Sequence, residues 1–301
     1  MTGSGVGDPR LRLRIVAAYA TIYLVWGSTF LAIRIGVRDL PPLLFAGGRF
    51  ILAGSLLVVV ALGLRERFPR IAREWRYMLL FSLLMITFSN GLSTLAMRHI
   101  PSNEGALLAA GTALWIAWLG ALGPSGHKLT VRGMIGLLLG LAGVALLVWP
   151  RESVASGHLG WQSMVLVSGL SWAVGTVVYR NVALPVGPVA FNAVMMLLGG
   201  TWLLLGGIAT GEPPHWTWQP AGLAALVYLA LFGSALAYTA YTWLLKHSPA
   251  DRVATFAYVN PAIAAVLGWA VLGETLGPAQ VAGMLVVLLG VALVTLPRRL
   301  A

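Results

Sequence analysis

Long apolar stretches and short polar joints alternate along the whole chain. Each apolar stretch is close to the roughly 20 residues that a helix needs to cross ~30 Å of hydrocarbon. Proline and glycine punctuate the joints, as they do where helices end. The pattern therefore predicts an all-α integral membrane protein with ten transmembrane helices, at residues 14–37, 43–64, 76–98, 104–123, 131–149, 159–181, 187–208, 219–246, 252–272 and 278–296.

The pattern also repeats within the chain. Residues of the first half recur in the second at an offset of 146 to 148, in the pairs Trp26/Trp172, Arg34/Arg180, His99/His247, Pro101/Pro249, Gly136/Gly283, Gly143/Gly290 and Pro150/Pro297. We therefore expect two homologous five-helix repeats, residues 1–150 and 151–301. Because five is an odd number, the second repeat must be inverted in the membrane relative to the first. Inverted repeats are typical of secondary transporters, whose substrate site lies between the repeats.

Composition agrees with a membrane protein. Of the 301 residues, 58% are hydrophobic and only 10% are charged, against roughly 25% charged in soluble domains. The absence of cysteine excludes disulfides, thiolate metal sites and cysteine nucleophiles. The net charge of +11 suggests nucleic acid as a partner, but the arginines gather in short loops between apolar runs. That distribution is typical of a membrane topology signal and not of a nucleic-acid surface.

The basic residues also predict the orientation. With the N-terminus in the cytoplasm, nearly all Lys and Arg fall on the cytoplasmic side; the exceptions are Arg49, within the second span, and, in outer segments, Arg34, Arg38, Arg98 and Arg151. We therefore expect both termini to be cytoplasmic. The basic start of the chain precedes an apolar run that is too long for a signal peptide and lacks a cleavage site, so we expect it to be the first helix.

Three segments resemble a known family. They are VWGSTFLAIR (Val25–Arg34), RFILAG (Arg49–Gly54) and the long run from Ala250 to Leu293, with a proline in mid-helix and Gly-Glu at the helix end. Together they resemble the EamA-type branch of the drug/metabolite transporter superfamily, over nearly the whole chain. Within that family the sequence is similar to bacterial aromatic amino acid exporters. The resemblance implies a protein of the bacterial inner membrane.

The resemblance also implies where the substrate would bind. It implies a cavity lined by the first, third, fourth, sixth, eighth and ninth helices, with the fifth and tenth at the periphery. In the first half Ala113 stands where the second half has Pro261, and Gly126-His127 stands where the family has Gly-Glu. The two halves are therefore not expected to move equivalently.

Mid-membrane charge is scarce. All nine carboxylates and all five histidines fall in loops or within about a turn of a span end. A proton-coupled carrier usually places an acid or a histidine at mid-membrane as a relay, so this distribution favours facilitated diffusion by a uniporter. Glu104 and Glu274 leave proton coupling open, since either could lie in a cavity that water reaches.

Arg49 is the one charge well inside a predicted span. It could bind a substrate carboxylate. Alternatively, it could have a structural role, by pairing with a loop acid such as Asp39 or by capping backbone carbonyls. We favour the structural role, because the resemblance places the second helix outside the cavity lining.

Polar and aromatic residues at mid-depth on the lining helices are the candidate ligands. Asn90, Thr112 and Asn260 would form hydrogen bonds with the backbone groups of an amino acid, since buried asparagine is costly and needs a reason. Pro261 removes a backbone donor within its helix and is the candidate hinge. The full set of expected substrate-binding residues is Trp26, Asn90, Thr112, Trp115, Trp172, Tyr238, Tyr258 and Asn260.

The function that these features favour is export of amino acids with aromatic or large apolar side chains, by alternating access between the repeats. A multidrug or quaternary-cation efflux transporter is the alternative, but it would need a mid-membrane acid as counter-charge. A channel-like uniporter also stays open. An intramembrane enzyme would need a nucleophile–base pair or a metal cluster at depth, so we expect no enzyme, no cofactor and no metal.

The expected partners are a small-molecule substrate, taken to be an amino acid, and the lipid bilayer, with no nucleic acid. Glycine-rich faces at Gly136-x-x-x-Gly140, Gly199-Gly200 and Gly206-Gly207 permit close helix packing. They would serve either a dimer or packing within one chain. We favour packing within one chain and hence a monomer.

Overall fold

The computed structural model describes residues 9–99, 108–122, 130–148, 159–272 and 278–295. Every regular element in these ranges is helical, which confirms the expected all-α fold. The helices are α1 (Pro9–Asp39), α2 (Pro42–Gly63), α3 (Ala72–Phe81), η1 (Ser82–Phe88), α4 (Ser89–Ala96), α6 (Thr112–Leu122), α7 (Val131–Val148), α8 (Leu159–Asn181), α9 (Pro188–Ala209), η2 (Pro213–His215), α10 (Pro220–Tyr228), η3 (Leu229–Leu236), α11 (Ala237–His247), α12 (Ala250–Val253), α13 (Phe256–Leu272) and α14 (Pro278–Thr295).

These helices follow the expected spans. The spans predicted at 76–98 and 219–246 each consist of three consecutive segments, α3–η1–α4 and α10–η3–α11, in which η1 and η3 are π-helical. Within the described ranges, six spans are long and apolar enough to cross a membrane, and shorter apolar helices cover Leu108–Gly120, Val131–Gly143 and Val281–Gly290. The start of the span predicted at 104–123 and the expected repeat boundary at residue 150 lie outside the described residues.

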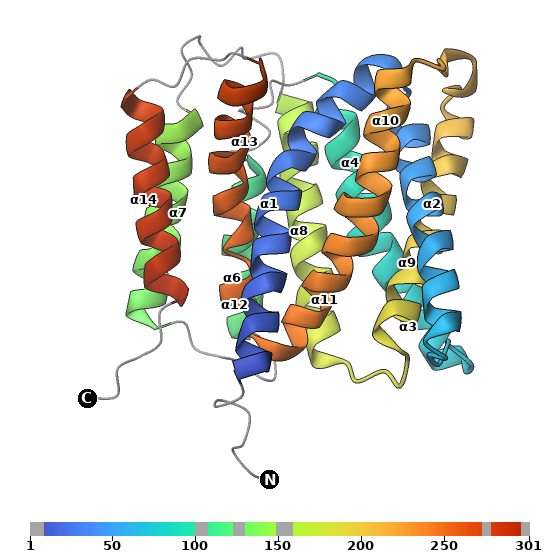
Figure 1. Cartoon of the computed structure of the whole chain (residues 1–301), viewed down its shortest axis with the longest axis horizontal. Helices are drawn as coiled ribbons and strands as arrows, with labels where there is room; N and C mark the ends of the chain where they lie inside the picture. Colours follow the sequence, from blue (N-terminus) through green and yellow to red (C-terminus); the bar gives the residue numbers. More distant parts are fainter. Residues whose placement is uncertain (1–8, 100–107, 123–129, 149–158, 273–277, 296–301) are drawn as a thin grey trace.

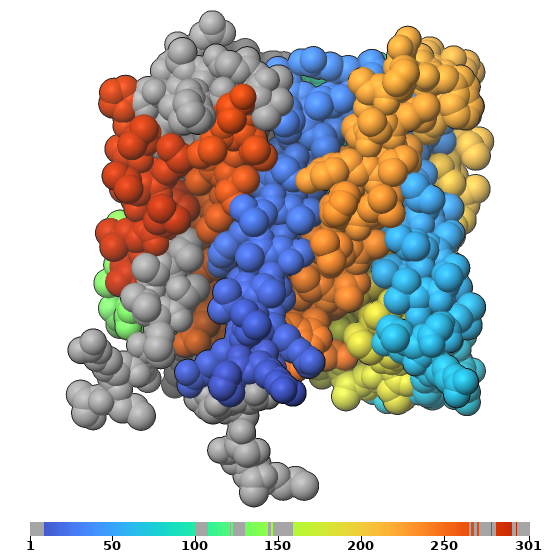
Figure 2. All heavy atoms as spheres, viewed as in Figure 1, coloured from blue at the N-terminus to red at the C-terminus, as the bar shows by residue number. Residues whose placement is uncertain are grey.

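Two of the pairs of equivalent helices lie at opposite ends of the bundle. Figure 1 shows α7 beside α14 at one edge and α2 with α9 at the other, with the remaining helices between them. The fifth and tenth spans, α7 and α14, are therefore peripheral, as expected. Figure 2 shows α1 on one face, packed between α13 and the α10–α11 span.

The outer surface is apolar, as a bilayer requires. Large hydrophobic side chains point outward along the spans, including Leu24 on α1, Val59 on α2, Leu205 on α9 and Leu285 on α14. In water such a surface would aggregate, whereas in lipid it is the solvated face.

Two glutamates show that α2 and α9 are antiparallel. Glu212, just after α9, accepts hydrogen bonds from the Leu43 and Leu44 amides at the start of α2, at 3.1 and 2.9 Å. Glu66, just after α2, accepts the Val189 and Ala190 amides at the start of α9, both at 2.8 Å. Each carboxylate satisfies orphan amides at a helix N-terminus, where negative charge is also favoured by the helix dipole.

The two glutamates are themselves 146 residues apart, so each repeat completes the other by the same contact. Equivalent helices that run in opposite directions are what an inverted repeat requires. The structure thus confirms the expected inversion of the second half.

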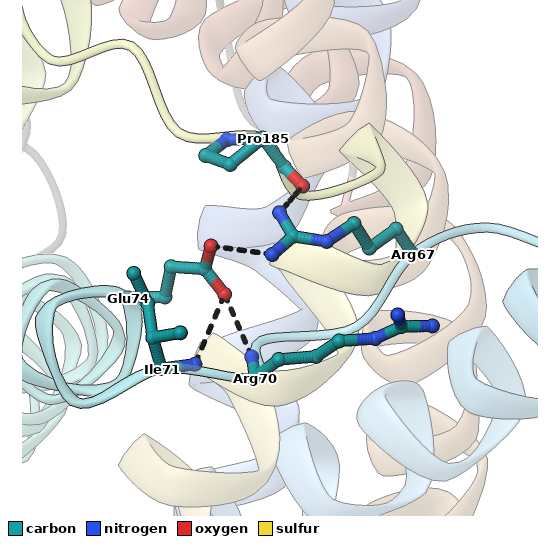
Figure 3. Close-up of polar contacts among 5 residues, drawn as sticks. All are labelled: Arg67, Arg70, Ile71, Glu74 and Pro185. Carbon is teal, nitrogen blue, oxygen red and sulfur yellow. Dashed lines mark hydrogen bonds and ion pairs between the residues drawn. The ribbon is translucent and has the colours of Figure 1, made fainter.

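Polar contacts also hold the connection between α2 and α3, next to the α2–α9 pair. The Arg67 guanidinium forms an ion pair with Glu74 at 2.8 Å and donates to the Pro185 carbonyl in the connection before α9 (Figure 3). The other Glu74 oxygen accepts the Arg70 and Ile71 amides at 2.6 and 3.4 Å. These contacts hold the α2–α3 connection of the first repeat against the segment that leads into α9 in the second.

Glycines bring the equivalent helices into backbone contact. A Cβ at Gly54 of α2 would lie 3.0 Å from the Ala193 carbonyl oxygen of α9. A Cβ at Gly143 of α7 would lie 2.6 Å from the Val287 amide nitrogen of α14, and one at Gly290 would lie 2.7 Å from the Gly136 oxygen. The glycine-rich faces therefore serve packing within the chain, which is the role we favoured. A monomeric state stays a prediction.

The α7–α14 contact gives a stability prediction. Gly143→Ala should destabilise the protein by about 1–3 kcal/mol, because the added methyl meets backbone that cannot move aside. Gly120→Ala on α6 is the matched control, since a Cβ there meets nothing within 4 Å and alanine favours a helix by up to about 1 kcal/mol. Thermal unfolding in detergent should show a lower midpoint for Gly143→Ala alone. Equal midpoints would contradict the backbone contact.

Candidate functional site

A cavity of about 140 Å³ lies among the central helices. Its lining comes from the expected first, third, fourth, sixth, eighth and ninth spans, here α1, α4, α6 with the residues just before it, α8, α11 and α13. The second span also contributes, through Arg49 of α2. The expectation that the second span stays outside the lining is therefore wrong, because the long arginine side chain reaches further than its helix.

Five rings pack together beside the cavity, and we call them the aromatic cluster: Trp26, Trp172, Tyr238 and Phe256 line the cavity, and Tyr241 packs against them. The Trp26 ring centroid lies 5.5 Å from that of Trp172 and 4.7 Å from that of Phe256, both edge to face. Tyr238 lies 5.6 Å from Trp26 and 5.3 Å from Trp172. Each edge-to-face pair stabilises the packing by about 0.5–1.5 kcal/mol beyond the burial of apolar area, so we expect the rings of the cluster to be rigidly held.

The indole N–H groups and the tyrosine hydroxyls of the aromatic cluster form hydrogen bonds within the protein. Trp26 Nε1 donates to the Gly233 carbonyl at 3.0 Å, and Trp172 Nε1 donates to the Tyr241 hydroxyl at 3.0 Å. Asn90 Nδ2 donates to the Tyr238 hydroxyl at 2.7 Å. Because these hydrogen bonds fix the rings, the cluster presents hydrocarbon surface to the cavity in a defined orientation.

The π-helical segments η1 and η3 supply several of these bonds. A π-helix leaves backbone carbonyls without their usual partners, and such segments are frequent at functional sites. In η1 the Met85 carbonyl accepts Asn90 Nδ2 at 2.9 Å, and the Leu84 carbonyl accepts the Ser171 hydroxyl of α8 at 2.8 Å. In η3 the Gly233 carbonyl accepts Trp26. The equivalent spans of the two repeats thus widen at the same depth, next to the cavity.

Most of the expected ligands line this cavity, namely Trp26, Asn90, Thr112, Trp172, Tyr238 and Asn260. Two do not. Tyr258 lies two residues from Asn260, about 200° around a helix, and packs instead against Gly140 of α7, where an added Cβ would lie 2.9 Å from the ring. Trp115 lies almost a turn beyond Thr112 and has its ring centroid 6.0 Å from that of Trp118. Substrate binding by the lining residues stays a prediction.

Asn260 has an unusual environment. Its Oδ1 atom is buried and has no hydrogen-bond partner among the described residues. It lies on the cavity wall beside Ala257, whose carbonyl has no intrahelical donor because Pro261 stands four residues on. The helix continues through Pro261, and its interruption falls earlier, at Ala254 and Thr255 between α12 and α13. A hinge at Pro261 stays a prediction.

Arg49 also differs from expectation. Its Nε donates to the Ser234 hydroxyl at 2.7 Å, and its guanidinium carbon lies 4.7 Å from the Phe50 ring centroid. Neither Asp39 nor a backbone carbonyl partners it within the described part of the chain. The ion pair found there joins Arg67 and Glu74, neither of which lines the cavity.

Carboxylates and histidines are absent from the described part of the cavity wall. The described carboxylates lie at or next to helix ends: Asp39, Glu66, Glu74, Glu212 and Asp251. Asp8, Glu104, Glu152, Glu274, His127 and His158 lie outside the described residues. In the described ranges no group of three His, Cys, Asp or Glu side chains could hold a metal ion.

The sequence-based set of site residues lacks Phe256, which lines the cavity, and Tyr241, which packs against the lining rings. Phe256 precedes Asn260 by four residues and Tyr241 follows Tyr238 by three, so each shares a helix face with a residue that was selected. That spacing was the available signal.

Comparison with known proteins agrees with the repeat and the fold. The profile of the EamA-like transporter family matches residues 14–149 and again 159–296. The uncharacterized inner membrane transporter YedA of Escherichia coli (strain K12) is 34% identical over 97% of this chain and 94% of its own length. The uncharacterized transporter YvbV of Bacillus subtilis (strain 168) is 29% identical over 95% of this chain and 92% of its own. A crystal structure at 20% identity shares the fold with a TM-score of 0.79, covering 93% of this chain and 97% of that one.

The cavity can be tested by cysteine labelling, because the chain has no native cysteine. Ser93→Cys, on the cavity wall, should react with a small charged thiol reagent at least about tenfold faster than Ser82→Cys, since thiol reactivity follows access. Ser82 is the matched control: it is fully buried in η1 and does not line the cavity. Equal labelling rates, measured by mass shift in detergent, would contradict a solvent-accessible cavity at this position.

Proposed function

The chain belongs to the EamA-like transporter family, and on that premise we propose that it exports amino acids with aromatic or large apolar side chains across the bacterial inner membrane. The family match supports the transport role. The relative YedA, itself named an inner membrane transporter, supports the location. The choice of amino acids rests on the chemistry of the cavity wall.

The observation that carries this proposal is the combination of an aromatic wall with polar groups in one cavity. The aromatic cluster offers ring faces and edges to an apolar side chain. Asn90, Thr112 and Asn260 lie on the same cavity. The orphan Asn260 Oδ1 suits the ammonium group of an amino acid, because buried polar atoms are rarely left without a partner. An amino acid with a large side chain matches both parts of the wall.

The cavity wall also favours amino acids over the rival class of large or cationic drugs. Its volume of about 140 Å³ is below the roughly 300–1,000 Å³ of pockets for drug-sized ligands. Arg49 is the charged side chain on its described wall, and its positive charge would repel a quaternary cation.

The proposed mechanism is alternating access, with one five-helix repeat moving against the other around the central cavity and both termini in the cytoplasm. We further propose uniport, since the described wall carries no acid or histidine to relay a proton.

The function is tested in liposomes that hold the purified protein. Labelled phenylalanine should show saturable flux, and an imposed pH gradient should not change its initial rate. Flux that appears only with the gradient would contradict uniport and indicate a proton site outside the described wall. No flux of phenylalanine, tryptophan or threonine would contradict amino-acid transport.

Asn260→Ala should lower phenylalanine flux at least about tenfold, because a hydrogen bond to a charged group contributes roughly 1.5–3 kcal/mol. Thr201→Ala is the control: this exposed α9 hydroxyl bonds only the Leu197 carbonyl of its own helix. Amounts of folded protein are compared by size-exclusion chromatography. Wild-type flux from well-folded Asn260→Ala would remove Asn260 from the site.

A further inference from the structure

Arg49 carries a positive charge into the middle of the protein. Only 3% of its surface is exposed, and α2 is one of the spans apolar enough to cross a membrane. Ionisable residues at such depth are costly, and they generally pair with a partner or mark a substrate path. The contacts of Arg49 decide between these two roles.

The protein occupies only part of the guanidinium. A guanidinium offers five N–H donors, and the recorded bond, to the Ser234 hydroxyl, uses the Nε group. Within the described residues the terminal nitrogens have no hydrogen-bond partner, and they are not among the fully buried, unsatisfied atoms. They therefore face the cavity that Arg49 helps to line.

The described glutamates are engaged elsewhere. Glu66 and Glu212 cap the N-termini of α9 and α2, and Glu74 holds Arg67. No described carboxylate lines the cavity. A guanidinium whose terminal edge is open fits a carboxylate in a bidentate pair, which is the geometry that arginine favours over lysine.

We infer that Arg49 binds the carboxylate of the transported solute, so that the substrates are small organic carboxylates. The inference rests on the proposed function and deepens it: Arg49 holds the carboxylate, Asn260 Oδ1 accepts from the amino group, and the aromatic cluster contacts the side chain. The guanidinium lies over the Phe50 ring, and its Nε–H bond to Ser234 restricts its rotation. Arg49 is thus a binding residue and not the structural one that the sequence favoured.

The test compares ligands that lack either the carboxylate or the amino group of phenylalanine. Phenylalanine, phenylalaninamide and 3-phenylpropionate are offered to the purified protein, and binding is followed by tryptophan fluorescence, since Trp26 and Trp172 line the cavity. Flux of each compound is measured in liposomes in parallel. The wild type should bind phenylalanine at least about tenfold more tightly than its amide, as charge-assisted bidentate pairs are stronger than neutral ones.

Variants at Arg49 should change this preference. Arg49→Gln should lose affinity for both carboxylates at least about tenfold and keep its affinity for the amide, which also shows that it is folded. Arg49→Lys should keep part of the preference for carboxylates over the amide, because lysine keeps the positive charge but cannot form the bidentate pair. Arg76→Gln, an exposed arginine of α3, is the matched control and should behave as the wild type.

The outcomes separate the two proposals. A wild type that treats phenylalanine and its amide alike overturns the role of Arg49, whatever the variants do, and leaves amino-acid transport standing if both are carried. Arg49-dependent binding of carboxylates without any amino-acid flux overturns the proposed function and keeps the carboxylate site. Absence of binding by all three compounds overturns both.

Discussion

Polar groups at depth in this bundle need partners within the protein, because hydrocarbon supplies none. That constraint explains where the side-chain hydrogen bonds lie. At the N-termini of the equivalent helices α9 and α2, Glu66 and Glu212 accept hydrogen bonds from amides that have no acceptor within their own helix. At mid-depth, the carbonyls of η1 and η3 receive side chains from other helices. Arg49 and Asn260, which keep polar atoms without a partner among the described residues, both line the cavity; the other buried unpartnered atoms, on Tyr179, Asn192, Trp216 and Tyr258, lie away from it.

The repeat builds a symmetric scaffold around an asymmetric cavity. Trp26 and Trp172 are equivalent residues of α1 and α8, and they meet in the aromatic cluster. Asn90 and Tyr238, 148 residues apart, are equivalent too, yet one donates a hydrogen bond to the other. The residue equivalent to Arg49 is the buried Met195. The charge therefore lies on one side of the pseudo-two-fold axis, which gives a bound solute a defined direction.

The sequence was sufficient for the helices, the repeat and its inversion, because span length, parity and offset are local or periodic properties. It was sufficient for most lining residues, since mid-depth polarity on the implied helices selects them. It failed where the face of a helix matters: Tyr258 points to α7 while Asn260, two residues on, faces the cavity. It also failed for Arg49 and the capping glutamates, whose partners are set by side-chain reach across helices distant in sequence.

The reciprocal glutamates have a consequence for how the chain is made. The amides of Leu43 and Leu44 enter the bilayer region early in synthesis, but the carboxylate that satisfies them belongs to a residue made much later. Until α9 and Glu212 have been synthesised, the amides at the N-terminus of α2 lack their carboxylate partner. Water, lipid headgroups or the insertion machinery must form hydrogen bonds with these amides in the meantime. The first half therefore cannot complete its own packing by itself, because this contact forms only after Glu212 of the second half has been made.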